Sequence, residues 1–200
     1  MPRIVDVDVR RAELTDATAR VIARSGIEAA TMREIAAEAG WTTGALTHYF
    51  ADKRELLLAT FQSSLAARRS RRDELVDAST IERLRASLNG ALPIDDDRRR
   101  HWLVTLAACS HASGSRPLAD AQRDAYREFR DYLIILVEEV GLANGTDARH
   151  IAERLIALAD GIAIQAMFDP ESWPAERQQG ALDAVLDTVL DTVLDGMPVR

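Results

Sequence analysis

The chain has 200 residues, enough for one medium domain or for a small domain joined to a medium one. Hydrophobic residues make up 47% of it and charged residues 28%, as in globular proteins, and a net charge of −7 argues against general binding of polyanions. Its single cysteine, Cys109, excludes an internal disulfide and a zinc site built from cysteines.

With only 10 glycines and 6 prolines, the composition predicts helix nearly throughout, and four helices are expected in the amino-terminal third. Apolar residues at three-to-four spacing predict the first helix over residues 9–25, and Gly26 stops it. Thr31 has the position of an N-cap for the second helix, which Gly40 ends.

Thr42 or Thr43 caps a short third helix that runs to about Phe50. Asp52 then caps a longer fourth helix, and the character of the sequence changes beyond Arg72. Five further helices are expected, over residues 80–92, 95–109, 118–140, 148–168 and 175–195. Because no segment has the two-residue period of a strand, the sequence predicts an all-α fold.

The segment Thr31–Lys53 has the layout of a helix-turn-helix, in which the second helix enters the major groove of DNA. Gly44 and Ala45 keep that helix thin, so its backbone can come close to base edges. Threonines in the turn and the helix offer hydroxyl groups to phosphates or bases and methyl groups to thymine, and His48 adds a donor.

Bulk charge does not support DNA binding, because residues 1–55 hold 8 Lys/Arg against 9 Asp/Glu. The hypothesis therefore depends on where single groups lie. Lys53 lies at a helix start, where exposed N–H groups already favour a phosphate, and Thr31 and Arg33 open the preceding helix as further phosphate candidates.

Three ordered patterns carry a family resemblance: T-M-R-E-I-A-A-E-A-G from Thr31, T-T-G-A-L-T-H-Y-F from Thr42 and D-K-R-E-L-L from Asp52. Through them, segment 9–60 resembles the DNA-binding domain of the tetracycline-repressor (TetR) family. The stretch A-L-A-D-G-I-A-I-Q-A-M-F-D-P (Ala157–Pro170) is similar to the ligand-binding domains of the betaine-regulator-like branch of that family. The resemblance implies a dimeric regulator whose Tyr49 and Lys53 hold the DNA backbone.

Together, the residues and the resemblance predict one set of DNA contacts: Thr31, Arg33, Thr42, Thr43, Gly44, Ala45, Thr47, His48, Tyr49 and Lys53. Two positions depart from the common pattern of the family. Trp41 stands where a small aliphatic residue is more usual, so it must pack differently or partly face the DNA. Thr47 replaces a more usual aromatic residue, so base preference is not transferred from relatives.

The last helix, A-L-D-A-V-L-D-T-V-L-D-T-V-L-D-G-M, carries a broad apolar stripe beside a row of aspartates. It could pack on its own domain, or it could form a dimer seam with the small-residue face of helix 148–168, as a four-helix bundle. We favour the dimer, because a helix-turn-helix reads two half-sites roughly 34–36 Å apart. The expected interface residues are Ala159, Ala163, Leu182, Val185, Leu186, Val189, Leu190 and Val193.

An effector pocket is expected between the helices of residues 80–168, although for each lining residue simple core packing is the alternative. The candidates are Trp102, Leu106, Cys109, Phe129, Tyr132, Leu133, Asp160, Ile164 and Gln165. Asp160 and Gln165 stand out, because a polar residue on a largely apolar helix needs a partner when it is buried. An aspartate near aromatic rings would suit a cationic ligand. We interpret the arginines at 68, 69, 71 and 72 as a solvated face or as charges that complement a helix end.

Two other classes of protein are compatible with a helical composition. An all-helical metalloenzyme needs Glu three residues before His on two helices, and none of the four histidines has it. Phosphate-loop and nucleophile motifs are also missing, so we expect no enzyme, no cofactor and no metal. The second rival, a DNA-independent protein-interaction scaffold, stays open.

The sequence therefore predicts a three-helix DNA-binding domain over 8–55, with its helix-turn-helix at about 31–50, and a larger helical domain over 56–200 for ligand binding and dimerisation. The expected function is transcription regulation, with a repressor that binds a palindromic DNA operator as a homodimer and leaves it when a small molecule binds. We expect no membrane association and a cytoplasmic protein, because no stretch approaches ~20 apolar residues and the amino terminus holds no apolar signal core.

Overall fold

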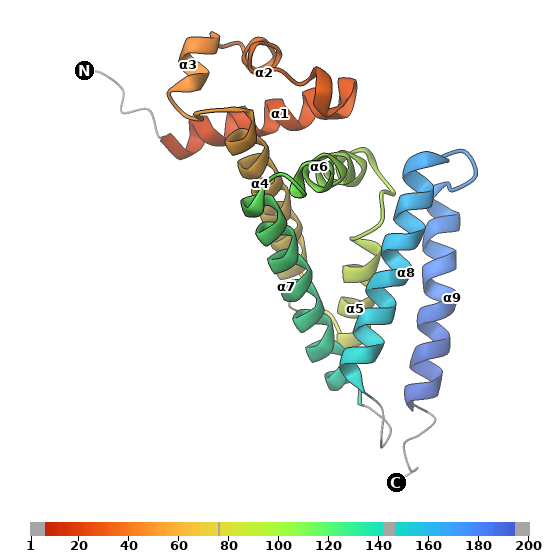
Figure 1. The fold of residues 1–200 in the computed structure, drawn as a ribbon. Helices are drawn as coiled ribbons and strands as arrows, with labels where there is room; N and C mark the ends of the chain where they lie inside the picture. The colour runs from red at the N-terminus through yellow and green to blue at the C-terminus, as the bar shows by residue number, and fades with distance from the viewer. Residues whose placement is uncertain (1–6, 76, 142–146, 195–200) are drawn as a thin grey trace. The chain divides into compact units, whose positions relative to one another are not determined.

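The computed structural model describes residues 7–75, 77–141 and 147–194, without the side chains of 192–194, and every regular element in these ranges is an α-helix (Figure 1). This confirms the predicted all-α fold class. The first four helices are α1 (Val7–Ala29), α2 (Met32–Glu38), α3 (Thr43–Thr47) and α4 (Lys53–Asp73). Gly26 interrupts α1 as expected, because its φ of 77° is left-handed, but a further turn follows before the helix ends.

The remaining helices are α5 (Thr80–Asn89), α6 (Asp96–Ala112), α7 (Arg116–Val140), α8 (Ala148–Phe168) and α9 (Ala175–Leu194). Asp147 caps α8, since its carboxylate accepts the backbone N–H of Arg149 at 2.9 Å. α7 begins two residues before the predicted start at Leu118, and Pro117 fits its first turn because the missing N–H would have no partner there. Within the described ranges, no helix is long and apolar enough to span a membrane.

The described chain forms two compact units. The first contains the residues up to Ala67 together with Arg100–Arg123, and the second contains Arg68–Arg99 together with the residues from Asp124 onward. Three helices, α4, α6 and α7, continue from one unit into the other. At each of these three crossings, the chain therefore passes from one unit to the other within a helix and not through a loop.

The core of the first unit holds the amino-terminal helices against α6 and the start of α7. Leu46 and Phe50, at and just after α3, are 0% and 1% exposed, and Phe61 of α4 is fully buried beside them in the same cluster. Val104 of α6 and Leu118 of α7 complete it. The position of the short helix α3 is thus set by tertiary packing, because a five-residue helix is not stable alone.

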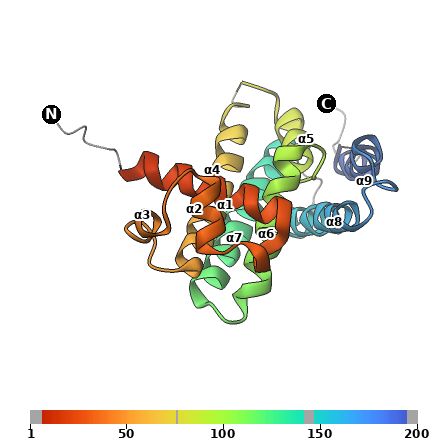
Figure 2. The ribbon, with the colours of Figure 1, turned by 90° about the horizontal axis from the view of Figure 1, so that it is seen from above.

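In the second unit, α8 packs along α9, and α5 contacts both helices. Figures 1 and 2 show α8 and α9 side by side in both views. Arg85 of α5 binds two carboxylates of α9, those of Asp183 and Asp187, at 2.5 Å each. This pairing holds one polar edge of α9 against α5.

A charged contact joins α1 to α2 in the first unit. The Glu38 carboxylate accepts hydrogen bonds from Arg20 Nε at 2.8 Å and from Arg24 Nη1 at 2.7 Å. These bonds, that of Arg20 first, hold the pKa of Glu38 below its ordinary value. The ionised form of Glu38 is therefore the form that the folded state prefers.

We expect Glu38→Gln to lower the free energy of unfolding at neutral pH. Since the folded-state pKa is depressed, this stabilisation is complete above the ordinary carboxyl range and is lost as the pH falls through the folded-state pKa. The difference between variant and wild type should therefore shrink as the pH falls below 4.5, the ordinary value. Denaturant unfolding followed by circular dichroism measures it, and Glu28→Gln, at an exposed position near the end of α1, is the control. A difference that is independent of pH would contradict the ionic origin.

Candidate nucleic-acid interface and ligand cavity

The turn between α2 and α3 depends on Gly40, whose φ of 73° is the left-handed conformation that side chains disfavour. Thr31 and Thr42 cap α2 and α3, because their hydroxyl oxygens accept backbone N–H groups three residues on, at 3.2 and 3.1 Å. The predicted caps are therefore confirmed. Each cap hydroxyl still has its own proton to donate outward.

α3 has one buried and one exposed side. Leu46 faces the core. Two adjacent pairs of residues are exposed on the outside: Thr43 with Gly44, and Thr47 with His48. Ala45 is half-buried. The helix ends at Thr47, earlier than the predicted end near Phe50, and the Thr47 hydroxyl donates to the Gly44 carbonyl at 2.9 Å.

Gly44 is not required by the fold. A Cβ added there would meet only the Thr42 hydroxyl oxygen, at 4.0 Å, within the described structure. The backbone conformation at Gly44 is also one that any residue adopts, since the left-handed glycines are Gly26, Gly40 and Gly141. Neither packing nor backbone conformation therefore requires that the side chain at position 44, on the outer surface of α3, be absent.

Aromatic residues and two arginines of α1 hold the carboxyl end of α3. Trp41 and Tyr49 meet edge to face, with ring centroids 5.4 Å apart, and the Arg10 guanidinium lies 5.3 Å from the centre of the Trp41 ring. Arg11 donates to the Tyr49 carbonyl and lies 4.1 Å from the centre of the Phe50 ring. Trp41 thus packs half-buried against the core, and sequence reasoning missed both arginines.

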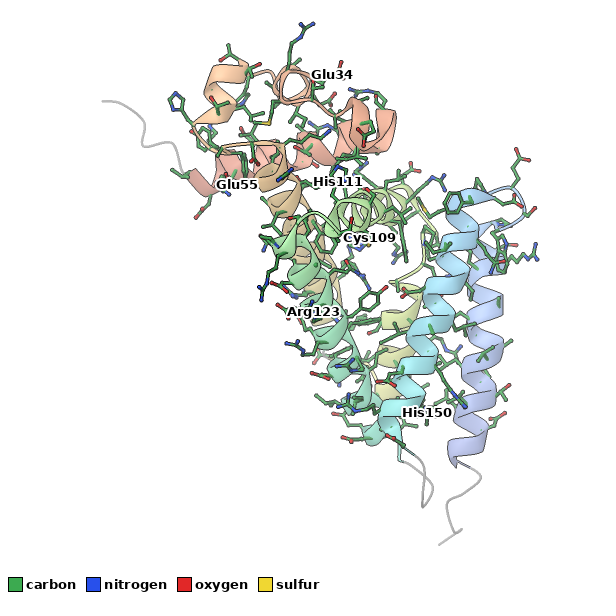
Figure 3. All side chains as sticks on the ribbon, viewed as in Figure 1. Glu34, Glu55, Cys109, His111, Arg123 and His150 are labelled. Carbon is green, nitrogen blue, oxygen red and sulfur yellow. The ribbon has the colours of Figure 1, made fainter. Side chains whose placement is uncertain are left out.

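The start of α4 is tied to the rest of the first unit. Lys53 is half-buried, and its ammonium donates to the Ile27 carbonyl at the end of α1. Asp52 caps α4 as predicted, with its carboxylate accepting the Glu55 N–H at 2.9 Å. Glu55, labelled in Figure 3, accepts the Ala51 N–H at 2.7 Å. Arg33 of α2 has an exposed side chain.

A cavity of about 280 Å³ lies within the second unit, lined by the end of α4, by α5 and by the start of α6. Its charged and polar lining consists of Arg68, Arg71, Arg72, Glu74, Ser87 and Arg98. The interpretation of the arginine run as a solvated face is therefore wrong for Arg68 and Arg72, which are half-buried against this cavity and the aromatic rings of α7. Spacing of three and four residues on one helix puts 68, 71 and 72 on one side, and that signal could have found the site.

The expected pocket residues are divided between the two units. Trp102, Leu106 and Cys109 belong to the first unit, and the other candidates belong to the second. Cys109 is exposed on α6, where Figure 3 labels it near His111. The side chain of Gln165 is exposed in the single chain and donates back to the Gly161 carbonyl at 3.3 Å.

Among the candidates of the second unit, Phe129 and Leu133 of α7 are buried, and Tyr132 and Ile164 are half-buried. Asp160 of α8 accepts a hydrogen bond from the Tyr126 hydroxyl at 2.6 Å. Burial raises the pKa of the Asp160 carboxyl, against the opposing effects of this bond and of Arg68. Asp160 thus already has a protein donor.

Most of the expected dimer residues are used inside the chain. The residues Ala159, Ala163, Leu182, Leu186 and Leu190 are buried within a single chain, in the core where α8 meets α9. These five side chains are therefore core residues of the single chain and offer little surface to a second one. Val189 is half-buried, and the side chain of Val193 lies outside the described residues. Val185 is 42% exposed, and Phe168, which was not predicted, is 80% exposed.

Two family models match the chain. The model for bacterial regulatory proteins of the tetR family matches residues 14–60, and the model for the carboxyl-terminal domain of BetI-type transcriptional repressors matches residues 80–191. The chain is also 34% identical over 173 residues to the HTH-type transcriptional regulator PksA of Bacillus subtilis, covering 85% of this chain and 84% of that protein. It is 32% identical to the regulator BetI of Rhizobium meliloti, covering 82% and 81%.

Solved structures of transcriptional regulators have a similar fold. A transcriptional regulator from Rhodococcus sp. Rha1 superposes with a TM-score of 0.82 at 29% identity, over 95% of this chain and 98% of that one. A regulator from Saccharomonospora viridis, crystallised in complex with choline, has a TM-score of 0.82 at 24% identity, over 90% and 96%. At 24% identity, the similarity to the Saccharomonospora viridis regulator concerns the fold alone.

Proposed function

We propose that this chain, which belongs to the tetracycline-repressor family of transcriptional regulators and carries a BetI-type carboxyl-terminal domain, binds a palindromic DNA operator as a homodimer and leaves it when a small molecule binds. It acts as a repressor, in the cytoplasm with the bacterial chromosome. The proposal gives it no catalytic role and no cofactor.

The observation that carries the proposal is the outer side of α3, which is exposed, thin and rich in hydroxyl groups while its inner side is locked into the core. Such a helix can enter a major groove and place small polar side chains against base edges. Phosphates on either side would be held by groups at helix starts. The proposed contacts are Thr31, Arg33, Thr42, Thr43, Gly44, Ala45, Thr47, His48, Tyr49 and Lys53.

Lys53 and Tyr49 have internal contacts that orient them. The ammonium of Lys53 is held by the Ile27 carbonyl, and the ring of Tyr49 is held by Trp41. A phosphate contact by Lys53 would add to this bond or replace it. We infer that these two residues link the DNA backbone to the ends of α1 and α3, so that bound DNA also fixes the position of α3.

A homodimer would use the outer sides of α8 and α9. Phe168 and Val185 are exposed there, and a Cβ added at Gly161 would meet nothing within 4 Å. Burial of such apolar side chains against a two-fold copy stabilises association. The four-helix bundle proposed for the dimer is kept, but its residues change to those that the single chain leaves uncovered.

Control by a small molecule requires a connection between the cavity and the DNA-binding helices. α4 supplies it, because it begins at Lys53 next to the proposed phosphate contacts and continues to the arginines that line the cavity. An effector that binds better when α4 is moved would favour the form that does not bind DNA. Coupling of this kind is typically about 1–3 kcal/mol.

Arg33→Gln tests the DNA-binding half of the proposal. Because Arg33 is exposed and assigned to a phosphate, its loss should weaken binding to the DNA upstream of the chain's own gene similarly for all sequence variants of the site. The slope of log affinity against log salt should fall by about 1 for each lost contact, hence by about 2 for a dimer. A salt-titrated binding assay measures this, with Arg127→Gln on α7 as the control. An unchanged slope would remove Arg33 from the interface, and no binding by the wild type would contradict the function.

A further inference from the structure

The cavity of the second unit is unusual in its charge. Four arginines and one glutamate, Glu74, line a space of about 280 Å³, so positive charge dominates the lining. Carboxylates that do not line it hold two of the arginines: Asp95 binds Arg98 at 2.7 Å and Glu128 binds Arg72 at 3.0 Å. Two of the four guanidinium groups are therefore held in place by carboxylates that are not part of the lining.

Crowding of these groups is costly in the folded chain. Burial, and then the neighbouring charge of Arg72, lowers the pKa of Arg68 to about 10. Arg98 has a buried Nε without a hydrogen-bond partner in the described structure. A buried donor without an acceptor is destabilising, and like charges in a cavity repel. An anion within the cavity would relieve the repulsion between these charges.

The aromatic rings beside the cavity are not open to an external cation. The Arg72 guanidinium lies 5.4 Å from the centre of the Phe129 ring and 4.9 Å from that of Tyr132. Arg68 lies 5.3 Å from the centre of the Phe129 ring. The chain's own cations therefore already take the positions over these rings that a quaternary ammonium ligand would need. The expectation of a cationic ligand therefore does not fit this cavity.

The size of the cavity limits its ligand. Its volume of about 280 Å³ lies near the lower end of the range for small-molecule pockets, roughly 300–1,000 Å³. Leu75 and Ala86 provide apolar lining, and the Ser87 hydroxyl lies 3.5 Å from that of Tyr132. Guanidinium groups bind carboxylate and phosphate in a two-pronged geometry. A compact organic anion would satisfy both the charge and the apolar wall.

We propose that the cavity between α4, α5 and the start of α6 binds a small organic anion with a carboxylate or phosphate group, held by Arg68, Arg71, Arg72 and Arg98. Its role as the effector rests on the function proposed above. The anion draws the end of α4 toward α5 and α6, and α4 carries the change to its start at Lys53. The ligand class is thus opposite in charge to the choline bound by the Saccharomonospora viridis regulator.

The test is calorimetric titration of the full-length protein with inorganic phosphate, succinate, benzoate and choline chloride, all at one ionic strength. At least one anion should bind saturably, and choline should not. Arg98→Met and Arg71→Met should each weaken that binding by roughly ten- to a hundredfold, as for the loss of a charge-assisted hydrogen bond. Arg127→Met, which removes an exposed arginine of α7, should leave it unchanged. Circular dichroism checks that the variants are folded, and Arg71 is exposed, so its loss should not disturb the core.

Three outcomes would each overturn the anion site. They are saturable binding of choline alone, no binding of any of the three anions, and equal anion binding by the wild type and both cavity variants. Operator DNA separates this result from the proposed function. If an anion binds as expected but the wild type fails to bind its upstream DNA without ligand, the regulator function fails and the site stands. If DNA binds and the anion does not weaken it, the effector role is overturned.

Discussion

Gly44→Ala is expected to weaken operator binding strongly without unfolding the chain. The described structure leaves open space for the new methyl group, with the Thr42 hydroxyl oxygen 4.0 Å away as its nearest contact. Alanine also favours helix over glycine, so stability should stay equal or rise by up to about 1 kcal/mol. The methyl group would instead meet the DNA. Loss of one base contact costs about 1–3 kcal/mol in each half-site, so for a dimer the operator Kd rises by roughly thirtyfold or more.

Fluorescence anisotropy with labelled operator DNA measures the affinity, and thermal unfolding measures the stability. Gly114→Ala is the matched control, since a Cβ there meets only the His111 carbonyl oxygen at 3.9 Å, an ordinary contact, and Gly114 lies in the same unit but far from α3 in the sequence. Normal operator affinity in Gly44→Ala would show that the DNA does not approach this surface of α3. The proposed contacts at Thr43 and Thr47 would then have to be abandoned as well.

Phe168→Glu is expected to convert the proposed dimer into a folded monomer. The side chain is 80% exposed at the end of α8, so the single chain gains little from it. Burial of a phenylalanine is worth about 1.5–3 kcal/mol, and a two-fold interface contains it twice. Loss of about 3–6 kcal/mol raises the dimer dissociation constant by roughly a hundred- to ten-thousandfold. Operator binding should fall with it, because each monomer then holds one half-site alone.

Sedimentation equilibrium over a range of concentrations gives the association state, and circular dichroism shows whether the helices persist. Ile135→Glu is the control, because Ile135 is also an exposed apolar residue, 53% accessible, but lies on α7. A variant at Phe168 that stays dimeric while the Ile135 variant dissociates would move the interface to α7. Dissociation of neither would leave the exposed sides of α8 and α9 without the proposed partner.

The order and type of the helices could be predicted because their signals are local. A cap such as Thr31, Thr42 or Asp52 bonds to an N–H group three residues away, so the sequence around it carries the whole interaction. The role of Gly40 can be predicted for the same reason, because a left-handed residue that ends a helix depends on few residues other than itself. The helix-turn-helix and its exposed hydroxyl groups follow from these short-range choices.

The roles of the arginines and of the apolar stripes could not be predicted, because they depend on residues far apart in the sequence. Arg11 bonds the Tyr49 carbonyl across 38 positions, and Lys53 bonds the Ile27 carbonyl across 26. The apolar stripe of α9 is wide enough to pack in the core of its own chain or against a second chain. The spacing of its apolar residues would be the same in both cases, so the sequence does not distinguish them. Only the packing of α8 on α9 decided that Leu182 and Leu186 turn inward and that Phe168 stays outside.

By itself, the sequence determined an all-α regulator of the tetracycline-repressor family, with α3 as the helix that presents small polar groups outward. Local bonds and the helical period were sufficient for the helices, and the ordered motifs of residues 31–57 carried the resemblance to the family. Tertiary structure decided which cations line a cavity, which apolar residues remain uncovered and why the ligand should be an anion. Arg68 and Arg98 lie 30 positions apart on different helices, and only folding brings their charges to one space.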